Sequence, residues 1–317
     1  MLDSVCLGEI LIDMTPVDSH DGRVYEPNPG GAPANVAITL ARMGKKVGFI
    51  GTVGNDFFGE LLRHTLESSN ITTECLSTTK KAPTTFAFVH LDNNGERSFS
   101  FYRHPGADMF LQWTAKEKNL IQKAKILHCG SLSMTTPQLA SITRKVFYYA
   151  RKHKKIISFD PNIRLSLWQT PSFARKTILS VLSLVSILKV SEEELLFLSQ
   201  KQNINEGLQW ISRFSIPLVV ITRGKDGVIA QTPQGQFYCS SFDVPVVDTT
   251  GAGDAFVGGL LAKLSEFENS LSLSQQELLS VLQFASAVAA ITVSRRGAIP
   301  AIPSRSEVEH FLTSYQR

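Results

Sequence analysis

Two glycines and two aspartates lie within nine residues near the C-terminal end of the chain. Residues 248–256 read Asp-Thr-Thr-Gly-Ala-Gly-Asp-Ala-Phe, after an apolar, strand-like run at 242–247 and before apolar residues at helical spacing. Backbone N–H groups at Gly251, Ala252 and Gly253 would converge at the first turn of that helix, where the helix dipole favours an anion. The segment therefore predicts a phosphate cradle.

Asp254 would place a carboxylate beside this anion site. Like charges repel, so the arrangement is odd for merely holding a phosphate. It suits a carboxylate that takes the proton from a hydroxyl as that hydroxyl attacks a phosphoryl group. The alternative is that Asp254 only compensates the helix dipole.

Residues 248–256 resemble the C-terminal signature of the ribokinase-like (pfkB) carbohydrate kinases. Residues 30–37, Gly-Gly-Ala-Pro-Ala-Asn-Val-Ala, resemble the N-terminal signature of the same family. The two motifs occur in the right order near opposite ends, and the resemblance extends over residues 8–303. Residues 99–103, 159–164 and 297–303 look most like the fructokinase branch.

The family resemblance implies an α/β fold: a ribokinase-like three-layer αβα sandwich with a mostly parallel sheet and a small β-sheet lid. Short apolar runs alternating with helical patterns independently favour a parallel sheet covered on both faces. The expected strands are 4–12, 47–51, 126–129, 156–159, 187–190, 218–222 and 227–232. The expected helices are 33–43, 57–69, 138–152, 173–183, 191–199 and 204–214.

Two segments break this alternation. Residues 12–27 and 84–103 contain period-2 strands with turn signals at 21–22 and 92–95, and could together form a four-stranded sheet. In the family the equivalent strands form a lid over the sugar. We therefore expect one kinase domain over 1–317 with the lid strands inserted in it.

Composition narrows the function classes. With 43% hydrophobic and 19% charged residues, the chain has the composition of an ordinary globular protein. Its net charge of +4 is too small and too dispersed to indicate nucleic-acid binding. Four scattered cysteines indicate reduced thiols and no zinc site. There is no Walker A or dinucleotide motif, no signal peptide and no uncharged run of membrane length. We expect a cytoplasmic protein without a membrane partner.

The resemblance assigns roles to the residues. Asp254 would be the general base, and Gly251, Ala252 and Gly253 would stabilise the transferring phosphoryl group. Seven residues would contact the sugar or the phosphoryl group: Asp13, Gly30, Gly31, Asn35, Phe101, Arg103 and Arg164. Structural alternatives remain open, namely a strand-end carboxylate, a tight turn into a helix and phenylalanines packed under a hairpin.

The nucleotide residues implied by the resemblance are Thr222, Gly224, Gly227, Gly253 and Ser286, with a plain hairpin turn as the alternative for 222–227. Two positions depart from the family pattern. Ser191 replaces the usual asparagine of Asn-x-x-Glu, although Glu194 remains to hold Mg²⁺ through water, and Ser286 stands where asparagine is common beside adenine. Carbonyls of Asp248 and Thr250 are candidates for a K⁺ site.

These assignments predict an ATP-dependent sugar kinase that uses ATP, Mg²⁺ and K⁺, with fructose as the expected acceptor and fructose 6-phosphate as product. Alternatives within the family are 2-keto-3-deoxygluconate kinase, ribokinase and nucleoside kinase. A sugar sensor without catalysis is the alternative from another class, although it would have no need of Asp254. Edge strands of a lid often pair between subunits, so we also expect a homodimer.

Overall fold

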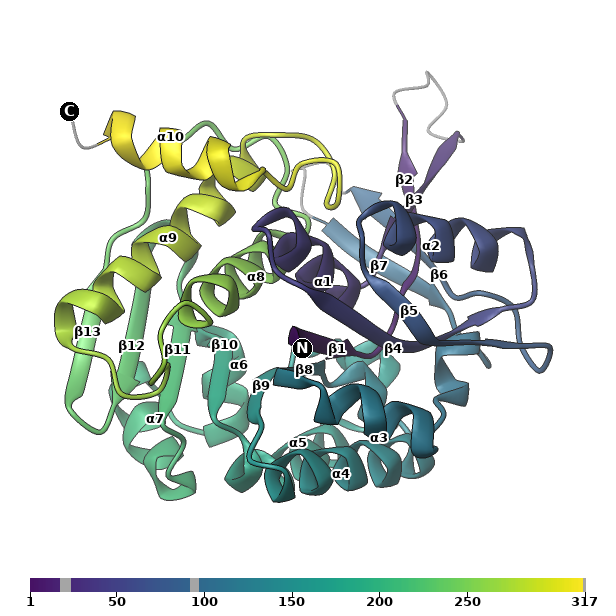
Figure 1. Cartoon of the computed structure of the whole chain (residues 1–317), viewed down its shortest axis with the longest axis horizontal. Helices are drawn as coiled ribbons and strands as arrows, with labels where there is room; N and C mark the ends of the chain where they lie inside the picture. Colours follow the sequence, from purple (N-terminus) through teal and green to yellow (C-terminus); the bar gives the residue numbers. More distant parts are fainter. Residues whose placement is uncertain (18–23, 92–96, 316–317) are drawn as a thin grey trace.

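The computed structural model describes residues 1–17, 24–91 and 97–315. Its larger sheet has nine strands in the order β13-β12-β11-β10-β9-β8-β1-β4-β5, all parallel except β12 and β13 (Figure 1). These strands are β1 (Leu2–Leu7), β4 (Val47–Gly54), β5 (Thr72–Thr79), β8 (Ala124–Gly130), β9 (Ile156–Asp160), β10 (Ile187–Ser191), β11 (Leu218–Thr222), β12 (Val228–Thr232) and β13 (Gly235–Cys239).

Helices cover both faces of this sheet, as the alternating sequence pattern predicts. They are α1 (Ala32–Arg42), α2 (Phe57–Ser68), α3 (Ala115–Gln122), α4 (Pro137–Lys152), α5 (Pro171–Leu179), α6 (Glu192–Ser199), α7 (Ile204–Ile211), α8 (Ala252–Leu264), α9 (Gln275–Val293) and α10 (Arg305–Tyr315). In β1, Cys6 packs with α1, α8 and α9, whereas Val5 and Leu7 pack with α3 to α7. Alternation along a strand thus builds two apolar cores, one on each face.

A second sheet has the order β3-β2-β6-β7, with β2 (Leu11–Pro16), β3 (Tyr25–Gly30), β6 (Phe86–Leu91) and β7 (Arg97–Tyr102). It stands beside the larger sheet (Figure 1), and we call it the lid sheet. β2 pairs parallel with β6, so two distant chain segments hold it together. The expected four-stranded arrangement is therefore present, although the expected turns at 21–22 and 92–95 lie outside the described residues.

Two expectations about strands were wrong. The expected strand 4–12 is two strands, because the chain leaves the larger sheet at Gly8 (φ 149°) and enters the lid sheet at Leu11. The run at 242–247 forms no strand: Val247 N–H donates to the Val293 carbonyl at the end of α9, and none of the described strands pairs with this run. Its alternating apolar residues face a cavity described below.

By length and hydropathy alone, helix α9 could cross a membrane, but 61% of its apolar stretch is buried inside the protein. It packs against α8, where a Cβ on Gly259 would lie 2.9 Å from Val288 Cγ2.

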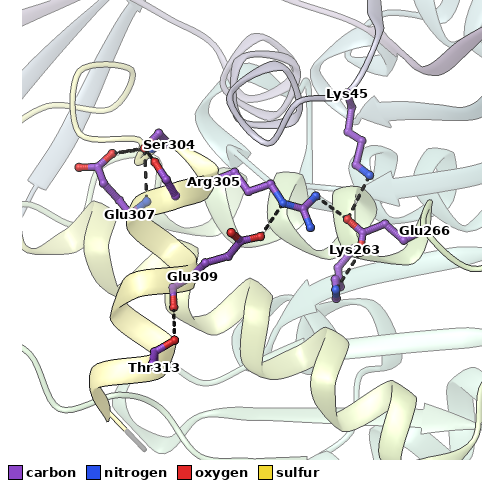
Figure 2. Close-up of polar contacts among 9 residues, drawn as sticks. Lys45, Lys263, Glu266, Ser304, Arg305, Glu307, Glu309 and Thr313 are labelled. Carbon is purple, nitrogen blue, oxygen red and sulfur yellow. Dashed lines mark hydrogen bonds and ion pairs between the residues drawn. The ribbon is translucent and has the colours of Figure 1, made fainter.

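Polar contacts hold α10 against the ends of two other helices (Figure 2). Arg305 binds Glu266 at 2.6 Å and Glu309 at 2.7 Å, while Lys45 and Lys263 also bind Glu266. This network joins α10 to the ends of α1 and α8.

Candidate active site

The start of α8 is the centre of the site. Gly251 is its N-cap with φ 75°, in the left-handed region that favours glycine, and a Cβ there would lie 3.0 Å from the Ala298 Cβ. The helix begins at Ala252, and Asp254 lies buried in its first turn. The Ala252 N–H makes a long bond of 3.3 Å to the Thr249 carbonyl. The helix dipole and the N–H groups of the first turn favour an anion at this end.

Two asparagines hold the Asp254 carboxylate. Asn35 Nδ2, from α1, donates to Oδ2 at 2.8 Å, and Asn162 Nδ2, from the loop after β9, donates to Oδ1 at 3.4 Å. Burial raises the pKa of Asp254 to about 7, and Asp160 adds to the rise, while Asn35, Lys189 and Arg164 oppose it. A carboxylate with such a pKa is matched to proton transfer near neutral pH.

A cavity of about 280 Å³ opens in front of Asp254. Nine of the residues expected at the site line it: Asp13, Gly31, Asn35, Phe101, Arg164, Thr250, Gly251, Gly253 and Asp254. They come from the lid sheet, from α1, from the loop after β9 and from the start of α8. The lid sheet and the larger sheet therefore enclose one polar cavity, which we call the acceptor cavity.

Asp13 enters the acceptor cavity from β2. It shares a face of the lid sheet with Ala87 and Phe101, as the strand registers require. Gly30 does not line the cavity, but a Cβ there would lie 2.1 Å from Asp13 Oδ2, so the glycine makes room for the carboxylate. Burial raises the pKa of Asp13 to about 7, Asp254 adds to the rise and Arg164 opposes it.

Arg103 does not line the acceptor cavity, although the sequence placed it on the same face as Phe101. It is buried, with Nε donating to Asp108 Oδ2 at 2.7 Å, Nη1 to Thr135 Oγ1 at 2.8 Å and Nη2 to the Leu132 carbonyl at 3.0 Å. These bonds hold the guanidinium behind the cavity wall. Its expected contact with the sugar stays a prediction.

Two ionisable residues that sequence reasoning missed also line the acceptor cavity: Glu9 and Lys189. Lys189 Nζ pairs with Asp160 at 3.0 Å, and a Cβ on Gly253 would lie 3.2 Å from Nζ. Burial disfavours its charge, but Asp160 and Glu194 outweigh burial and raise the pKa of Lys189. A charged ammonium thus stands beside the expected anion cradle. The sequence did hold a signal for both residues, because each is an ionisable residue inside an apolar run: Lys189 in 187–190 and Glu9 in 5–12.

A second cavity, of about 690 Å³, lies on the other side of the α8 start. The expected nucleotide residues Thr222, Gly224, Gly227, Gly253 and Ser286 all line it, and so does Ala252. Its apolar wall comes from the run that forms no strand and from the helices: Phe242, Val244, Val246, Phe256, Ala289, Ala290 and Val293. An apolar wall beside polar turns suits a purine and its phosphates.

The two cavities meet at Thr249 and Gly253, which line both. A phosphoryl group carried from the second cavity would reach Asp254 at this junction. A hydroxyl held in the acceptor cavity would meet it there. The arrangement can therefore join two ligands across a helix N-terminus that stabilises negative charge.

Ser191 and Glu194 form a capping box on α6. Ser191 Oγ accepts from Glu194 N–H at 3.2 Å, and Glu194 Oε2 accepts from Ser191 N–H at 2.9 Å. Glu194 Oε1 also accepts from Ile163 N–H at 2.6 Å. The Ser-x-x-Glu spacing was the sequence signal for this cap. Ser191 thus caps the N-terminus of α6, and Glu194 holds the loop that carries Asn162 and Arg164 by its bond to Ile163 N–H.

Asp248 joins two loops next to the α8 start. Its Oδ1 accepts from Thr250 N–H at 2.7 Å, and its Oδ2 accepts from Gly297 N–H at 2.9 Å. The hydroxyl of Thr250 is buried and has no hydrogen-bond partner among the residues that the structure describes. Within those residues no group of three or more His, Cys, Asp and Glu side chains could hold a metal.

Fold and site together define a phosphotransferase of the ribokinase-like type, with an alcohol acceptor and a nucleotide donor. The family model of pfkB carbohydrate kinases matches residues 1–305, and the chain belongs to that family. It is a sugar kinase.

Relatives and solved structures agree with this assignment. The probable fructokinase-6, chloroplastic, of Arabidopsis thaliana is 42% identical over 316 residues, covering 97% of this chain and 82% of the relative. A double mutant of the Vibrio cholerae O395 fructokinase, with fructose, ADP and potassium ion bound, has a TM-score of 0.90 at 36% identity, covering 98% of each chain. The Xylella fastidiosa fructokinase with bound ATP has a TM-score of 0.91 at 34% identity, covering 100% of each.

Proposed function

We propose that this protein transfers the γ-phosphoryl group of ATP to the 6-hydroxyl of fructose, forming fructose 6-phosphate. The observation that carries the proposal is the junction of the two cavities at the α8 start, with Asp254 on the acceptor side. The fructokinase relatives, one of them with fructose and ADP bound, support the choice of sugar.

Asp254 would take the proton of the attacking hydroxyl. Its two asparagine partners leave the carboxylate oriented toward the acceptor cavity, and its pKa of about 7 leaves a large ionised fraction at neutral pH. The N–H groups of Gly251, Ala252 and Gly253 would stabilise the charge on the phosphoryl oxygens, and Lys189 adds a cation beside them. Asp13 and Asn35 would bond the remaining sugar hydroxyls.

ATP would bind in the second cavity, with its purine against the apolar wall and its phosphates at the Thr222–Gly227 turn. Mg²⁺ would neutralise phosphate charge in the complex. Both oxygens of Glu194 already accept backbone bonds, so this side chain could approach the metal only through water. Asp160, whose Oδ2 pairs with Lys189 Nζ at 3.0 Å, is a further carboxylate that could approach the metal through water.

A monovalent cation fits the loops joined by Asp248. That carboxylate accepts from Thr250 N–H and Gly297 N–H, so it holds the turn before α8 against the loop at Gly297, and backbone carbonyls of these two loops would be the ligands. The buried Thr250 hydroxyl, which has no hydrogen-bond partner in the described part of the chain, would be a further oxygen ligand in this turn. We propose that K⁺ binds there and strengthens the local positive potential of the cradle.

The experiment is ADP release with ATP and Mg²⁺ over a panel of acceptors, with and without K⁺. We expect kcat/KM for fructose at least ~10-fold above that for ribose, 2-keto-3-deoxygluconate and adenosine, because a site that bonds particular hydroxyls rejects analogues that misplace them. A preference for 2-keto-3-deoxygluconate would overturn the sugar assignment and keep the mechanism. No turnover with any acceptor would favour a sensor.

We also propose that the protein is a homodimer joined through the outer face of the lid sheet. Tyr102 on β7 is 66% exposed there and contacts Phe88, which also contacts Tyr25. Beside them Phe57, 73% exposed at the start of α2, contacts Phe58, which contacts Phe86 of β6. In the described part of the lid sheet, β3 and β7 are edges. An exposed aromatic face with free edges is typical of a sheet that pairs with a second copy.

A further inference from the structure

Glu9 is the one acceptor-cavity carboxyl group, among the described residues, to which the proposed reaction gives no task. It lies between β1 and β2, where the chain crosses from the larger sheet to the lid sheet, and its side chain is buried. It lines the same cavity as Asp13 and Asp254. Its Oε2 atom has no hydrogen-bond partner among the described residues. A buried carboxyl oxygen without a partner is costly, so a ligand that supplies one would bind favourably.

The charged groups that the structure describes around Glu9 do not donate a hydrogen bond to its Oε2 atom. Arg103 directs its donors to Asp108, Thr135 and Leu132, and Asp108 balances the arginine charge at 2.7 Å. The other titratable groups that face Glu9 are Asp254 on α8 and Cys129 on β8, and neither is a cation. Burial raises the pKa of Glu9 to about 8; Asp108 and Asp254 add to the rise, while its own backbone N–H and Arg103 oppose it. At neutral pH the side chain therefore carries a proton.

The sheet order separates Glu9 from the cations of the cavity. Lys189 is on β10 and Arg164 follows β9, whereas Glu9 follows β1; three strand spacings, about 14 Å, lie between β1 and β10. The phosphoryl group would be transferred beside Lys189. Glu9 would then meet a sugar oxygen other than the one that reacts.

We propose that Glu9 is a specificity-determining sugar ligand that acts in its protonated form, donating its carboxyl hydrogen to a hydroxyl or ring oxygen of a neutral sugar. The inference rests on the proposed sugar kinase activity and deepens it. It requires that binding favour the protonated side chain, so that fructose binds more weakly as Glu9 ionises above about pH 8. A neutral amide should replace the acid, and an apolar side chain should not.

The test compares Glu9→Gln and Glu9→Leu with wild type by steady-state kinetics at pH 7 and pH 9. We expect Glu9→Leu to raise the fructose KM at least ~10-fold at pH 7 with little change in the ATP KM, because one buried hydrogen bond is lost. Glu9→Gln should stay within about threefold of wild type at pH 7 and lose the rise in KM at pH 9. Glu117→Leu, which removes another buried carboxyl group in the cap of α3, is the control for stability effects.

Calorimetry of fructose binding gives a second readout that does not depend on turnover. In buffers of different ionisation enthalpy at pH 8, wild type should take up about half a proton more per sugar than Glu9→Gln. Equal proton uptake, or an unchanged fructose KM in Glu9→Leu, would overturn the inference. Wild-type turnover of fructose in the same preparations keeps that outcome distinct from a failure of the proposed function.

Discussion

At the scale of single residues, the carboxyl groups of the acceptor cavity share one environment but have different tasks. Asp254 has two amide donors and stands at a helix N-terminus, whereas Asp13 lies on the face of the lid sheet that lines the acceptor cavity. Burial raises the pKa of each to about 7. Substitutions should therefore separate proton transfer from sugar binding.

Asp254→Asn should lower kcat at least ~10²-fold while sugar affinity stays within a few fold. The amide can still accept the Asn35 bond, but it cannot take the proton of the attacking hydroxyl. Single-turnover ADP release and calorimetric sugar binding measure the two effects separately. Turnover above about a tenth of wild type would show that another group is the base.

Asp13→Ala should raise KM for the sugar much more than KM for ATP. The sugar hydroxyls would lose bonds to a charged group, roughly 1.5–3 kcal/mol for each. Steady-state kinetics with each substrate varied in turn measures the difference, and Asp13→Asn controls for side-chain volume. An equal effect on both substrates would place Asp13 outside the sugar contacts.

The pH dependence of kcat follows from the raised pKa of Asp254. A base works only when ionised, so kcat should fall about tenfold per pH unit below about pH 7 and level off above it. The pH–rate profile for fructose measures this.

The pH dependence of stability should have the opposite sign to that of kcat. A carboxyl group whose pKa is raised by folding stabilises the native state at low pH, and this contribution is lost as pH rises through the folded pKa of about 7. Unfolding of the unliganded protein at pH 5.5 and pH 8.5 tests this: stability should be lower at pH 8.5 and the difference smaller in Asp254→Asn.

The sequence predicted the groups at the α8 start and around Asn35 because their glycines and polar residues form long motifs. Glu9 and Lys189 lacked such a motif. A charged residue in an apolar run does not show which cavity it enters until the strand order is known. Arg103 illustrates the reverse case, because strand alternation predicts a face but not the buried partners Asp108 and Thr135 that hold it.

At the scale of elements, the contact between α1 and α8 determines whether Asn35 reaches Asp254. The helices approach closely at Gly258, where a Cβ would lie 2.3 Å from Thr39 Cβ. Thr39 Oγ1 donates to the carbonyl of Asn35 at 2.8 Å, so movement of α1 at Thr39 also moves Asn35. Gly259, one residue later, faces α9 instead.

Gly258→Ala should therefore lower both stability and kcat. Overpacking costs about 1–3 kcal/mol, partly offset by the better helix propensity of alanine, about 1 kcal/mol. Gly259→Ala is the matched variant: its Cβ would lie 2.9 Å from Val288 Cγ2, so it should lose stability with a smaller effect on kcat. Thermal unfolding and kcat should be measured on both variants. Equal kcat values would contradict the role given to the α1–α8 contact.

Most elements of the larger sheet were predictable, since buried parallel strands are short apolar runs between helices. The failures have physical causes. Gly8 lets the chain change sheets inside a single apolar run, and residues 242–247 alternate because they line a cavity rather than join a sheet. Alternation along a run records which side chains share one side of the chain, not whether a sheet or a cavity lies on that side.

At the scale of the whole molecule, the lid sheet offers the acceptor cavity to one side and aromatic side chains to the other. Phe57→Glu and Tyr102→Glu should each convert a dimer into a monomer, because a charge would be buried in an apolar interface. Light scattering after size-exclusion chromatography measures the mass. Tyr148→Glu, an aromatic residue 61% exposed on α4, is the control and should leave the mass unchanged. A monomeric wild type would refute the proposed dimer.

The strand order also has a consequence for synthesis of the chain on the ribosome. β1 is made first but lies between β4 and β8, and its β8 neighbour emerges only when residue 130 has been translated. Asn35 and Asp254 are 219 residues apart, so the base acquires its partner only when α8 has left the exit tunnel. A nascent chain that has completed the lid strands still exposes the apolar face on which α8 will pack. Chaperones that bind apolar segments should therefore hold this chain until late in translation, and truncated products that lack α8 should aggregate rather than accumulate as partly active enzyme.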